Sequence, residues 1–407
     1  MLNATPANYR AVVATLKPGD RLILATGEYR NGLPIRGLEG TARQPIVIEG
    51  ATQAPRPLLT GRRGANTISI VDSRYVTIRN LKVDGRGLAV DAVKVEARSR
   101  YSDFITLEGL EIVGHGHDQQ IVGISVQRPA RGWIIRRNVI IGAGTGMYLG
   151  SSDGKEPFVE GLIEGNLVRD TIGYNLEIKH QKHRDNLPGG PTSPSVTIIR
   201  DNVFSKAEHA SGGESARPNV LVGHFPLTGP GKDDVYLIYR NFFYENPSEA
   251  LFQGEGNIAL YDNVFVNHSG DAIHIQPHNA VPRTVDIFYN TVIAHGTGIR
   301  ILGGDPATRQ RVFANVVFAA QPIEGGGQAN NVTGSLQDAD RDLRNPLGSI
   351  DTIDLRPRVH SLPKLHSIPQ IPGAYVDARN DFDGRERILD VPGAYASAGR
   401  SWTLGLS

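Results

Sequence analysis

The hexapeptide Ile134-Ile135-Arg136-Arg137-Asn138-Val139 is one copy of a phrase that recurs along most of the chain. In each copy a few apolar residues precede a polar pair, an Asn and a second apolar run. Consecutive copies lie 22 to 39 residues apart, and no helical periodicity separates them. A repeat of this length indicates a solenoid. The recurring position is occupied by Asn80, Gly109, Asn138, Asn166, Asn202, Asn241, Asn263, Asn290 and Asn315.

Each repeat is too short to pair its strands internally, so its strands must pair with those of the next copy. The architecture that meets this requirement is a single-stranded, right-handed parallel β-helix, and we therefore predict an all-β fold. The aligned Asn side chains are expected to form an internal ladder at a turn. Each would tolerate left-handed backbone geometry and hydrogen-bond to its neighbours above and below. We interpret all eight asparagines as scaffold.

The two ends of the chain differ from the repeat. Residues 8–30 contain a short amphipathic helix, from Tyr9 to Leu16, followed by a first strand. Beyond about residue 330 the ladder stops and proline becomes frequent. We predict a β-helix with an N-terminal helical cap over residues 1–330, and an irregular C-terminal tail over residues 331–407 that packs along it.

The composition excludes several classes of protein. The 43 Lys and Arg residues balance 42 Asp and Glu residues, which removes the basic excess of a dedicated nucleic-acid binder. No apolar run is long enough for a membrane helix. The absence of Cys excludes disulfides, thiolate metal sites and cysteine nucleophiles. We expect a monomer with no nucleic-acid partner. We also expect a secreted or periplasmic location, although this chain starts without a recognisable signal peptide.

A second column of strands follows the ladder segments. Apolar residues at alternate positions point into the shaft, and the residues between them point outward. Successive turns place these outward residues about 4.8 Å apart, which makes a strip of polar groups suited to an extended polymer. The outward set is Lys94, Glu96, Gln127, Tyr148, Glu177, Lys179, His274, Gln276 and Arg300.

The middle of the chain is the predicted site. The two longest repeat intervals fall there, and insertions in solenoids tend to border the binding face. The segment from Asn175 to Arg184 carries Lys179, Lys182 and Arg184 against one acidic residue, Glu177. Such a patch would bind polyanions, and crowding among cations could leave a lysine partly neutral and able to act as a base. The predicted substrate-binding residues are Gln127, His180, Lys182, His183, Arg184, His274 and Gln276.

Three segments resemble the chondroitinase B/alginate lyase-like β-helix enzymes. The opening Lys17-Pro18-Gly19-Asp20 and the later Gln44-Pro45-Ile46-Val47-Ile48 are similar to the start of those proteins. The strand Glu177-Ile178-Lys179-His180-Gln181 resembles the one that carries their catalytic lysine in an acidic, metal-binding environment. The ending Asp381-Phe382-Asp383-Gly384-Arg385 is similar to the closing motif of many bacterial β-helix proteins.

The resemblance implies β-elimination on an acidic polysaccharide that contains uronic acids. By this reading Lys179 is the base, and Glu177, with Asn175, would hold a hard cation such as Ca²⁺. Where the family carries an Arg on the next turn, this chain has Gly223-His224-Phe225. The acid that protonates the departing oxygen is then His224, Tyr148 or Arg300.

Three other functions stay open at this point. A C5-epimerase would begin with the same proton abstraction. A glycoside hydrolase would need two carboxylates near the scissile bond. Glu177 and Glu96 lie about three turns apart, too far for a close pair, although Asp153, Asp185 or Glu214 could complete one. A glycan-binding β-helix without catalytic activity is the fourth hypothesis.

Overall fold

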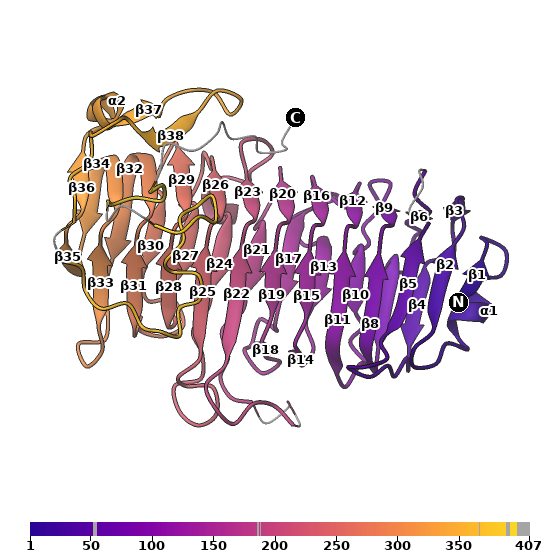
Figure 1. Ribbon diagram of the computed structural model, residues 1–407. Helices are drawn as coiled ribbons and strands as arrows, with labels where there is room; N and C mark the ends of the chain where they lie inside the picture. Colours follow the sequence, from indigo (N-terminus) through magenta and orange to yellow (C-terminus); the bar gives the residue numbers. More distant parts are fainter. Residues whose placement is uncertain (52–54, 185–186, 188, 366, 388–390, 397–407) are drawn as a thin grey trace. The chain divides into compact units, whose positions relative to one another are not determined.

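The computed structural model describes residues 1–51, 55–184, 187, 189–365, 367–387 and 391–396. Its contacts divide the chain into two compact units. Unit 1 comprises residues 1–198, 208–211 and 225–234, and unit 2 comprises residues 199–207, 212–224 and 235–407. Each unit is a stack of short parallel strands, which confirms the predicted parallel β-helix (Figure 1).

Unit 1 contains three rows of parallel strands. In row 1 the strands are β1 (Leu2–Ala4), β2 (Arg21–Leu24), β5 (Ile46–Gly50), β8 (Ser73–Arg79), β11 (Ser102–Glu108), β15 (Ile134–Arg136) and β19 (Leu162–Glu164), with β14 (Ala130–Arg131) and β18 (Phe158–Val159) beside them. In row 2 they are β3 (Glu28–Tyr29), β6 (Leu58–Thr60), β9 (Lys82–Asp84), β12 (Glu111–Val113), β16 (Val139–Ile141) and β20 (Leu167–Arg169). In row 3 they are β4 (Leu33–Arg36), β7 (Ile68–Val71), β10 (Val93–Val95), β13 (Val122–Val126), β17 (Thr145–Leu149) and β21 (Leu176–Ile178). The short helix α1 (Tyr9–Val13) buries Tyr9 and Val13.

Unit 2 repeats the same three rows. Row 1 contains β25 (Val235–Tyr239), β28 (Ile258–Tyr261), β31 (Val285–Phe288), β33 (Gln310–Phe313) and β35 (Gly327–Ala329). Row 2 contains β23 (Val203–Ser205), β26 (Phe242–Tyr244), β29 (Val264–Asn267) and β36 (Val332–Gly334), and row 3 contains β24 (Val220–Val222), β27 (Phe252–Gly254) and β30 (Ile273–Ile275). The long strands β32 (Thr291–Ile301) and β34 (Val316–Glu324) each extend through row 2 and row 3. The strand β22 (Val196–Arg200) contains the boundary between the units.

The interior of each stack is built from columns of aliphatic side chains. Ile78, Leu107, Ile135 and Ile163 occupy matching positions on successive strands of row 1, and all four are fully buried. Strand alternation sends every second side chain inward, so columns of inward side chains from each row fill the core. This is the physical reason why the repeating apolar phrase in the sequence predicts the fold.

The asparagine ladder exists, and in unit 2 it is continuous. Each Asn side-chain amide donates to the side-chain oxygen of the next Asn and to backbone carbonyls of the preceding turn, as at Asn263. The ladder extends one residue beyond the predicted set, to Asn331. The unit 2 members are Asn202, Asn241, Asn263, Asn290, Asn315 and Asn331.

Two details of the predicted ladder are wrong. The left-handed residue is the one before the Asn, as at Arg137 with a φ of 53° and Tyr289 with a φ of 54°. Asn80 itself has a φ of 56° and lies at this preceding position, so the ladder column holds Leu81 in that turn. The shift arises because Asn favours both left-handed backbone geometry and side-chain ladders, and a sequence phrase alone does not separate the two roles.

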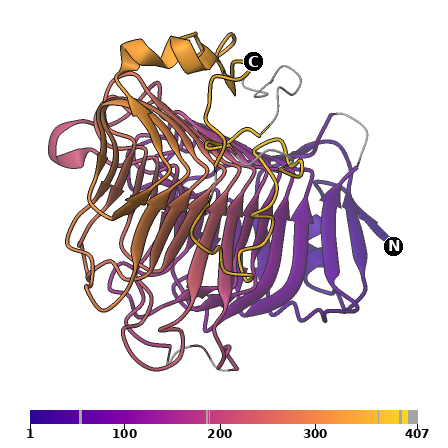
Figure 2. The ribbon, with the colours of Figure 1, turned by 60° about the vertical axis from the view of Figure 1, so that its left-hand side comes forward.

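The C-terminal segment of unit 2 packs on two of that unit's rows. The helix α2 (Ala339–Asp342) and the antiparallel pair β37 (Leu343–Asn345) and β38 (Asp354–Pro357) join an apolar cluster with row 2, which includes Val266 and Phe318. Further along, Tyr375 Oη donates to Asp286 Oδ2 at 2.7 Å, and Tyr261 Oη donates to the Val376 carbonyl at 2.6 Å. Figure 2 shows this yellow segment running across the orange strands of row 1.

Candidate functional site

Row 3 of unit 1 presents the predicted polar strip. The pairing of its strands places Lys94, Ser125, Tyr148 and Glu177 at matching positions on β10, β13, β17 and β21. The residues on either side of them point inward; Met147 and Leu176, for example, are fully buried. The outward side chains therefore form one column along the stack, as the alternation predicts.

Three predicted site residues meet on the last two of these strands. Lys179 follows β21 and places its Nζ 2.8 Å from Glu177 Oε1, and the same Nζ lies 5.7 Å from the centre of the Tyr148 ring. The side chain of Lys179 is 15% exposed and that of Glu177 only 3%, so the ion pair is largely shielded from water. An amine, a carboxylate and a phenol thus share one partly buried patch, which we call the Lys179 cluster.

Gly150 makes room for Lys179 on the neighbouring strand. Its φ is 90°, and a Cβ at this position would lie 3.1 Å from the Lys179 Cβ. A larger residue there would be strained in its backbone and would press on the lysine. The contact of Gly150 with Lys179 was not anticipated from the sequence, because it spans a full turn of the β-helix.

The phenol of Tyr148 is held in its protonated form. Burial raises its pKa above the usual value, and the negative charge of Glu177 adds to this effect, while a hydrogen bond with Ser152 works against it. A phenol that remains protonated at neutral pH can donate a proton. The sequence suggested that cations crowd around Lys179, whereas the structure gives this lysine an anionic partner.

The loop that follows Lys179 is anchored by a buried ion pair. Arg184 Nη2 pairs with Asp234 Oδ2, and the two side chains are 4% and 2% exposed. Asp234 Oδ1 also accepts the backbone N–H of Ser195 at 2.8 Å, and Gln181 Oε1 accepts from Arg184. The guanidinium of Arg184 is therefore used to hold the loop. Asp234 was not anticipated from the sequence, because 50 residues separate it from its partner.

The other predicted residues of this segment differ in exposure. His180 is buried, and its ring occupies the space beside Gly154, where a Cβ would come within 2.6 Å of it. Lys182 is exposed and His183 is partly exposed. Gln127 lies one residue beyond β13, and its Nε2 donates to Ser125 Oγ at 3.1 Å. As substrate-binding residues these four stay predictions.

A calcium site at Glu177 and Asn175 also stays a prediction. The Asn175 side-chain amide donates to Thr171 Oγ1 at 3.0 Å, and Glu177 is paired with Lys179. Ca²⁺ takes about six to eight oxygen ligands. Within the described ranges no three or more His, Asp or Glu side chains converge in a way that could hold a metal ion. No reaction step is therefore assigned to a metal.

Unit 2 carries its own polar cluster on row 3. The strand register places Gln253, His274 and Arg300 at matching positions of β27, β30 and β32. His274 Nε2 donates to Asp271 Oδ2 at 2.8 Å, and Arg300 Nη2 donates to His274 Nδ1 at 3.2 Å. Burial lowers the pKa of His274, and the charge of Arg300 lowers it further. We call this neutral imidazole and its two partners the His274 cluster.

Two further residues of unit 2 matter for the site. Gln276 helps to line a small hollow with His278 and Glu255. His224 is a buried residue of the same unit and stays a prediction as a catalytic acid. Asp271 was missed in the sequence, although an Asp three residues before a strand His is a signal that could have identified it.

Lys206 is a buried polar residue of unit 2 that the sequence did not single out. Its Nζ donates to the Arg217 carbonyl at 2.6 Å, and burial lowers its pKa to about 7. The side chain is fully buried, so we assign it a structural role in holding the segment that contains Arg217.

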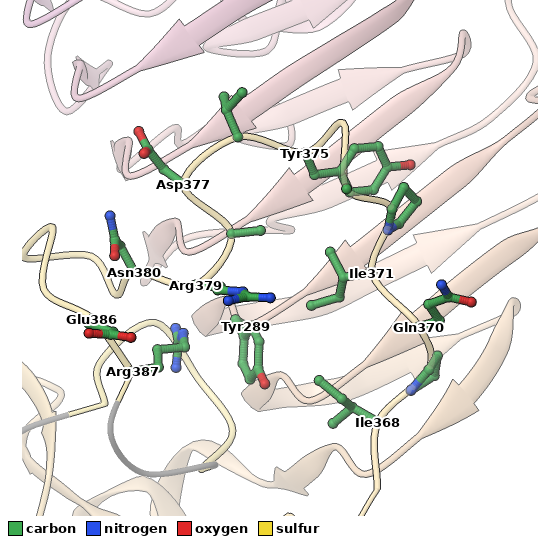
Figure 3. Close-up of a pocket in the computed structure, with 15 residues that line it drawn as sticks. Tyr289, Ile368, Gln370, Ile371, Tyr375, Asp377, Arg379, Asn380, Glu386 and Arg387 are labelled. Carbon is green, nitrogen blue, oxygen red and sulfur yellow. The ribbon is translucent and has the colours of Figure 1, made fainter.

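A cavity of about 760 Å³ lies within unit 2 between the C-terminal segment and Tyr289 (Figure 3). Two of its charged lining residues, Asp377 and Arg387, are engaged in holding that segment. Arg387 stacks on the Tyr289 ring and pairs with Asp262, while Asp377 lies within ion-pair distance of Arg240. Because these contacts fasten the tail, we place the candidate chemistry at the Lys179 cluster.

The sequence matches no family model and no curated protein. Solved structures do resemble it. An alginate lyase from Paenibacillus sp. strain FPU-7 is 19% identical over 82% of this chain and 99% of its own, with a TM-score of 0.49. A GH136 lacto-N-biosidase from Eubacterium ramulus is 14% identical over 80% of this chain and 64% of its own, with a TM-score of 0.51. The A-module of a mannuronan C-5 epimerase from Azotobacter vinelandii is 13% identical over 81% of this chain and 89% of its own, with a TM-score of 0.48.

These structural neighbours are a lyase, a glycosidase and an epimerase, all of them enzymes that act on glycans. At such low sequence identity the likeness to the lacto-N-biosidase, the one of these three with a TM-score above 0.5, shows the fold alone, and one fold can carry several unrelated activities. The activity of this chain must therefore be argued from its own residues.

Proposed function

We propose that the protein is a lyase that cleaves an acidic, uronic-acid-containing polysaccharide by β-elimination. The observation that carries the proposal is the Lys179 cluster, in which an amine, a carboxylate and a phenol lie on adjacent strands of an outward polar strip. β-Elimination needs a base for the proton next to the sugar carboxylate and an acid for the departing oxygen. Positioned side chains of this kind contribute about 10²- to 10⁴-fold each.

Lys179 is the proposed base. Its amine must be neutral to accept a proton, and Glu177 Oε1 at 2.8 Å is placed to take the extra proton of the ammonium group. A bound polymer would cover the pair and remove water from it. Exposed Lys182, with Gln127, is assigned to the sugar carboxylate.

Tyr148 is the proposed acid. As the proton moves to Lys179 Nζ, a carbon–carbon double bond forms in the sugar and the bond to the glycosidic oxygen breaks. Tyr148 Oη gives that oxygen its proton, and solvent later reprotonates the tyrosinate and removes the proton from Lys179. The phenol is protonated at neutral pH, as the role requires, and the departing oxygen is the more basic partner once its bond to carbon breaks. His224 and Arg300, which belong to unit 2, stay predictions as acids.

The test is to incubate the protein with uronate polymers and follow the ultraviolet absorbance of the unsaturated product. We expect Lys179→Met to lower the rate at least about 10²-fold, since it removes the base. Lys155→Met is the matched control, because Lys155 is an exposed lysine of the same unit. Absence of product on every polymer, or full activity in Lys179→Met, would contradict the proposal. Parallel assays with EDTA and with added Ca²⁺ test the predicted metal.

Other activities are possible outcomes of the same experiment. Inverted sugar residues without chain cleavage, detected by NMR, would identify a C5-epimerase. Release of reducing ends without ultraviolet absorbance would identify a hydrolase. The two positions before Glu177 in its column offer little for a hydrolase, because Tyr148 and Ser125 occupy them. Binding without turnover on any polymer would identify a glycan-binding protein.

The loop carboxylates considered for a hydrolase do not change the preference for a lyase over a hydrolase. Asp153 is an exposed residue of unit 1 beside Lys155, and Glu214 is an exposed residue of unit 2. Asp185 lies outside the described residues. Glu96 accepts hydrogen bonds from Ser69 and Asn66.

A secreted or periplasmic location belongs to the proposal, because a polysaccharide substrate is met outside the cytoplasm. A monomeric state is also part of the proposal. Within the described residues every helix is too short or too polar to cross a membrane.

A further inference from the structure

The arginines of unit 1 fall into two groups. Most of them pair with a carboxylate of the same or a neighbouring turn, as Arg79 does with Glu49 and Arg136 with Glu108. A second group forms no ion pair among the described residues. It includes five exposed residues near the start of the chain, namely Arg36, Arg62, Arg63, Arg86 and Arg98.

These five arginines surround two adjoining hollows of about 400 Å³ each. The first is lined by Arg62, Arg63 and Arg86, together with Arg30, and the second by Arg36, Arg62 and Arg98. Arg62 lines both, so the hollows adjoin each other. They are built from the end of β4, the loop between β6 and β7, the turn between β9 and β10, and the residues after β10.

The acidic groups at these hollows do not neutralise the arginines. Glu28 pairs with Arg30, which is outside the group of five. Asp84 Oδ1 accepts the backbone N–H of Arg86 at 2.8 Å. Glu96 Oε1 accepts from Ser69 Oγ at 2.6 Å. The five arginines outnumber the nearby carboxylates of Glu96 and Asp84, so the hollows keep an excess of positive charge although the whole chain is nearly neutral.

The second hollow lies on the same strip as the Lys179 cluster, and the first adjoins it at Arg62. Ser69, in the second hollow, occupies the position on β7 that Lys94, Ser125 and Tyr148 occupy on β10, β13 and β17. Three strand spacings separate Ser69 from Tyr148, or about 14 Å. A polymer that follows the strip from Tyr148 would reach the arginines within a few sugar units. Lys94 lies between them and is paired with Asp91.

We propose that these arginine-lined hollows are a distal subsite that binds the acidic groups of a polysaccharide chain several sugar units from Lys179. The inference rests on the proposed function for the identity of the polymer. Guanidinium groups suit the purpose because they bind carboxylate or sulfate groups through two parallel hydrogen bonds. The subsite would hold long acidic chains and leave short ones unaffected, so it determines preference for chain length.

The kinetic test is the double variant Arg62→Gln and Arg98→Gln, compared with Arg43→Gln, an exposed arginine outside the hollows. We expect the KM for a long uronate polymer to rise about tenfold or more in the double variant, since a hydrogen bond to a charged group contributes about 1.5–3 kcal/mol. The kcat, and the KM for an oligosaccharide too short to span the strip, should not change. Equal effects on short and long substrates would overturn the proposal.

A binding test separates this inference from the proposed function. Migration in native gels that contain alginate, polygalacturonate, chondroitin sulfate, neutral dextran or duplex DNA needs no turnover. Retardation by an acidic glycan that is lost in the double variant but kept in Lys179→Met and Arg43→Gln would support the subsite, even if no polymer is cleaved. The carboxylate and sulfate polymers show which acidic group is bound. Unchanged retardation in the double variant, or retardation by DNA alone, would overturn the proposal.

Discussion

The Lys179 cluster of unit 1 and the His274 cluster of unit 2 both lie on row 3 strands, yet burial affects them in opposite directions. In unit 1 it raises the pKa of Tyr148, and in unit 2 it lowers the pKa of His274. The physical cause is the same, because burial disfavours the charged form of either group. The phenol therefore stays protonated, and the imidazole stays neutral, with a proton on only one of its ring nitrogens.

The two clusters also differ in what their polar atoms are used for. Both ring nitrogens of His274 are engaged, one by Asp271 and one by Arg300. The amine of Lys179 has a carboxylate on one side and the face of Tyr148 on the other. The first arrangement fixes a neutral ring in place, whereas the second offers a base and an acid. Chemistry is therefore expected to depend far more on unit 1.

Substitution of Tyr148, the proposed acid, tests the difference between the Lys179 cluster and the His274 cluster most strongly. We expect Tyr148→Phe to lower turnover of a uronate polymer about 10²- to 10³-fold, whereas His274→Gln should lower it less than about tenfold. A substrate with an aryl leaving group needs little protonation of its departing oxygen, so Tyr148→Phe should recover most of its rate on it. An equal loss in both variants, or no recovery with the aryl substrate, would contradict the assignment of Tyr148 as the acid.

The scaffolds of the two units differ as well, which gives a test of stability. Asn263 Oδ1 accepts from both the backbone N–H and the side-chain amide of Asn241, and its own amide donates to Asn290, while Asn138 Oδ1 accepts from the backbone N–H of Leu110. Asn263→Leu removes partners from buried groups on both sides, and each such loss costs about 1–3 kcal/mol. We expect a larger fall in the urea midpoint for Asn263→Leu than for Asn138→Leu. The reverse order would show that the ladder contributes little to unit 2.

The smallest expected effect is a change in how stability depends on pH. Because the folded-state pKa of His274 is lowered, the unfolded chain binds its proton more readily, and stability decreases as pH falls below about 6.5. In His274→Gln, the free energy of unfolding should decrease less steeply with falling pH, by up to about 1.4 kcal/mol per pH unit. Urea midpoints between pH 5 and 8 measure this, with exposed His209→Gln as control. Parallel profiles for His274→Gln and the parent protein would contradict a neutral, buried His274.

The repeat fixed much of the candidate site in advance. Once strands stack in register, Tyr148 and Glu177 must fall in one outward column, and Lys179 must follow two residues later. The ladder was displaced by one residue at Asn80, because the same residue type suits the left-handed turn and the ladder. The ion pair of Arg184 with Asp234 and the bond of His274 to Asp271 were not anticipated, and the first joins segments 50 residues apart.

The sequence by itself determined the parallel β-helix and its outward polar strip. Alternation along a strand and repetition along the chain are local properties, so both can be recognised from the order of the residues. Only the tertiary structure decided which charges are neutralised: Lys179 by Glu177, Arg184 by Asp234, and the arginines around Arg62 by no carboxylate within the described part of unit 1. Whether two opposite charges meet depends on distances between turns and loops, and those distances exist only once the chain has folded.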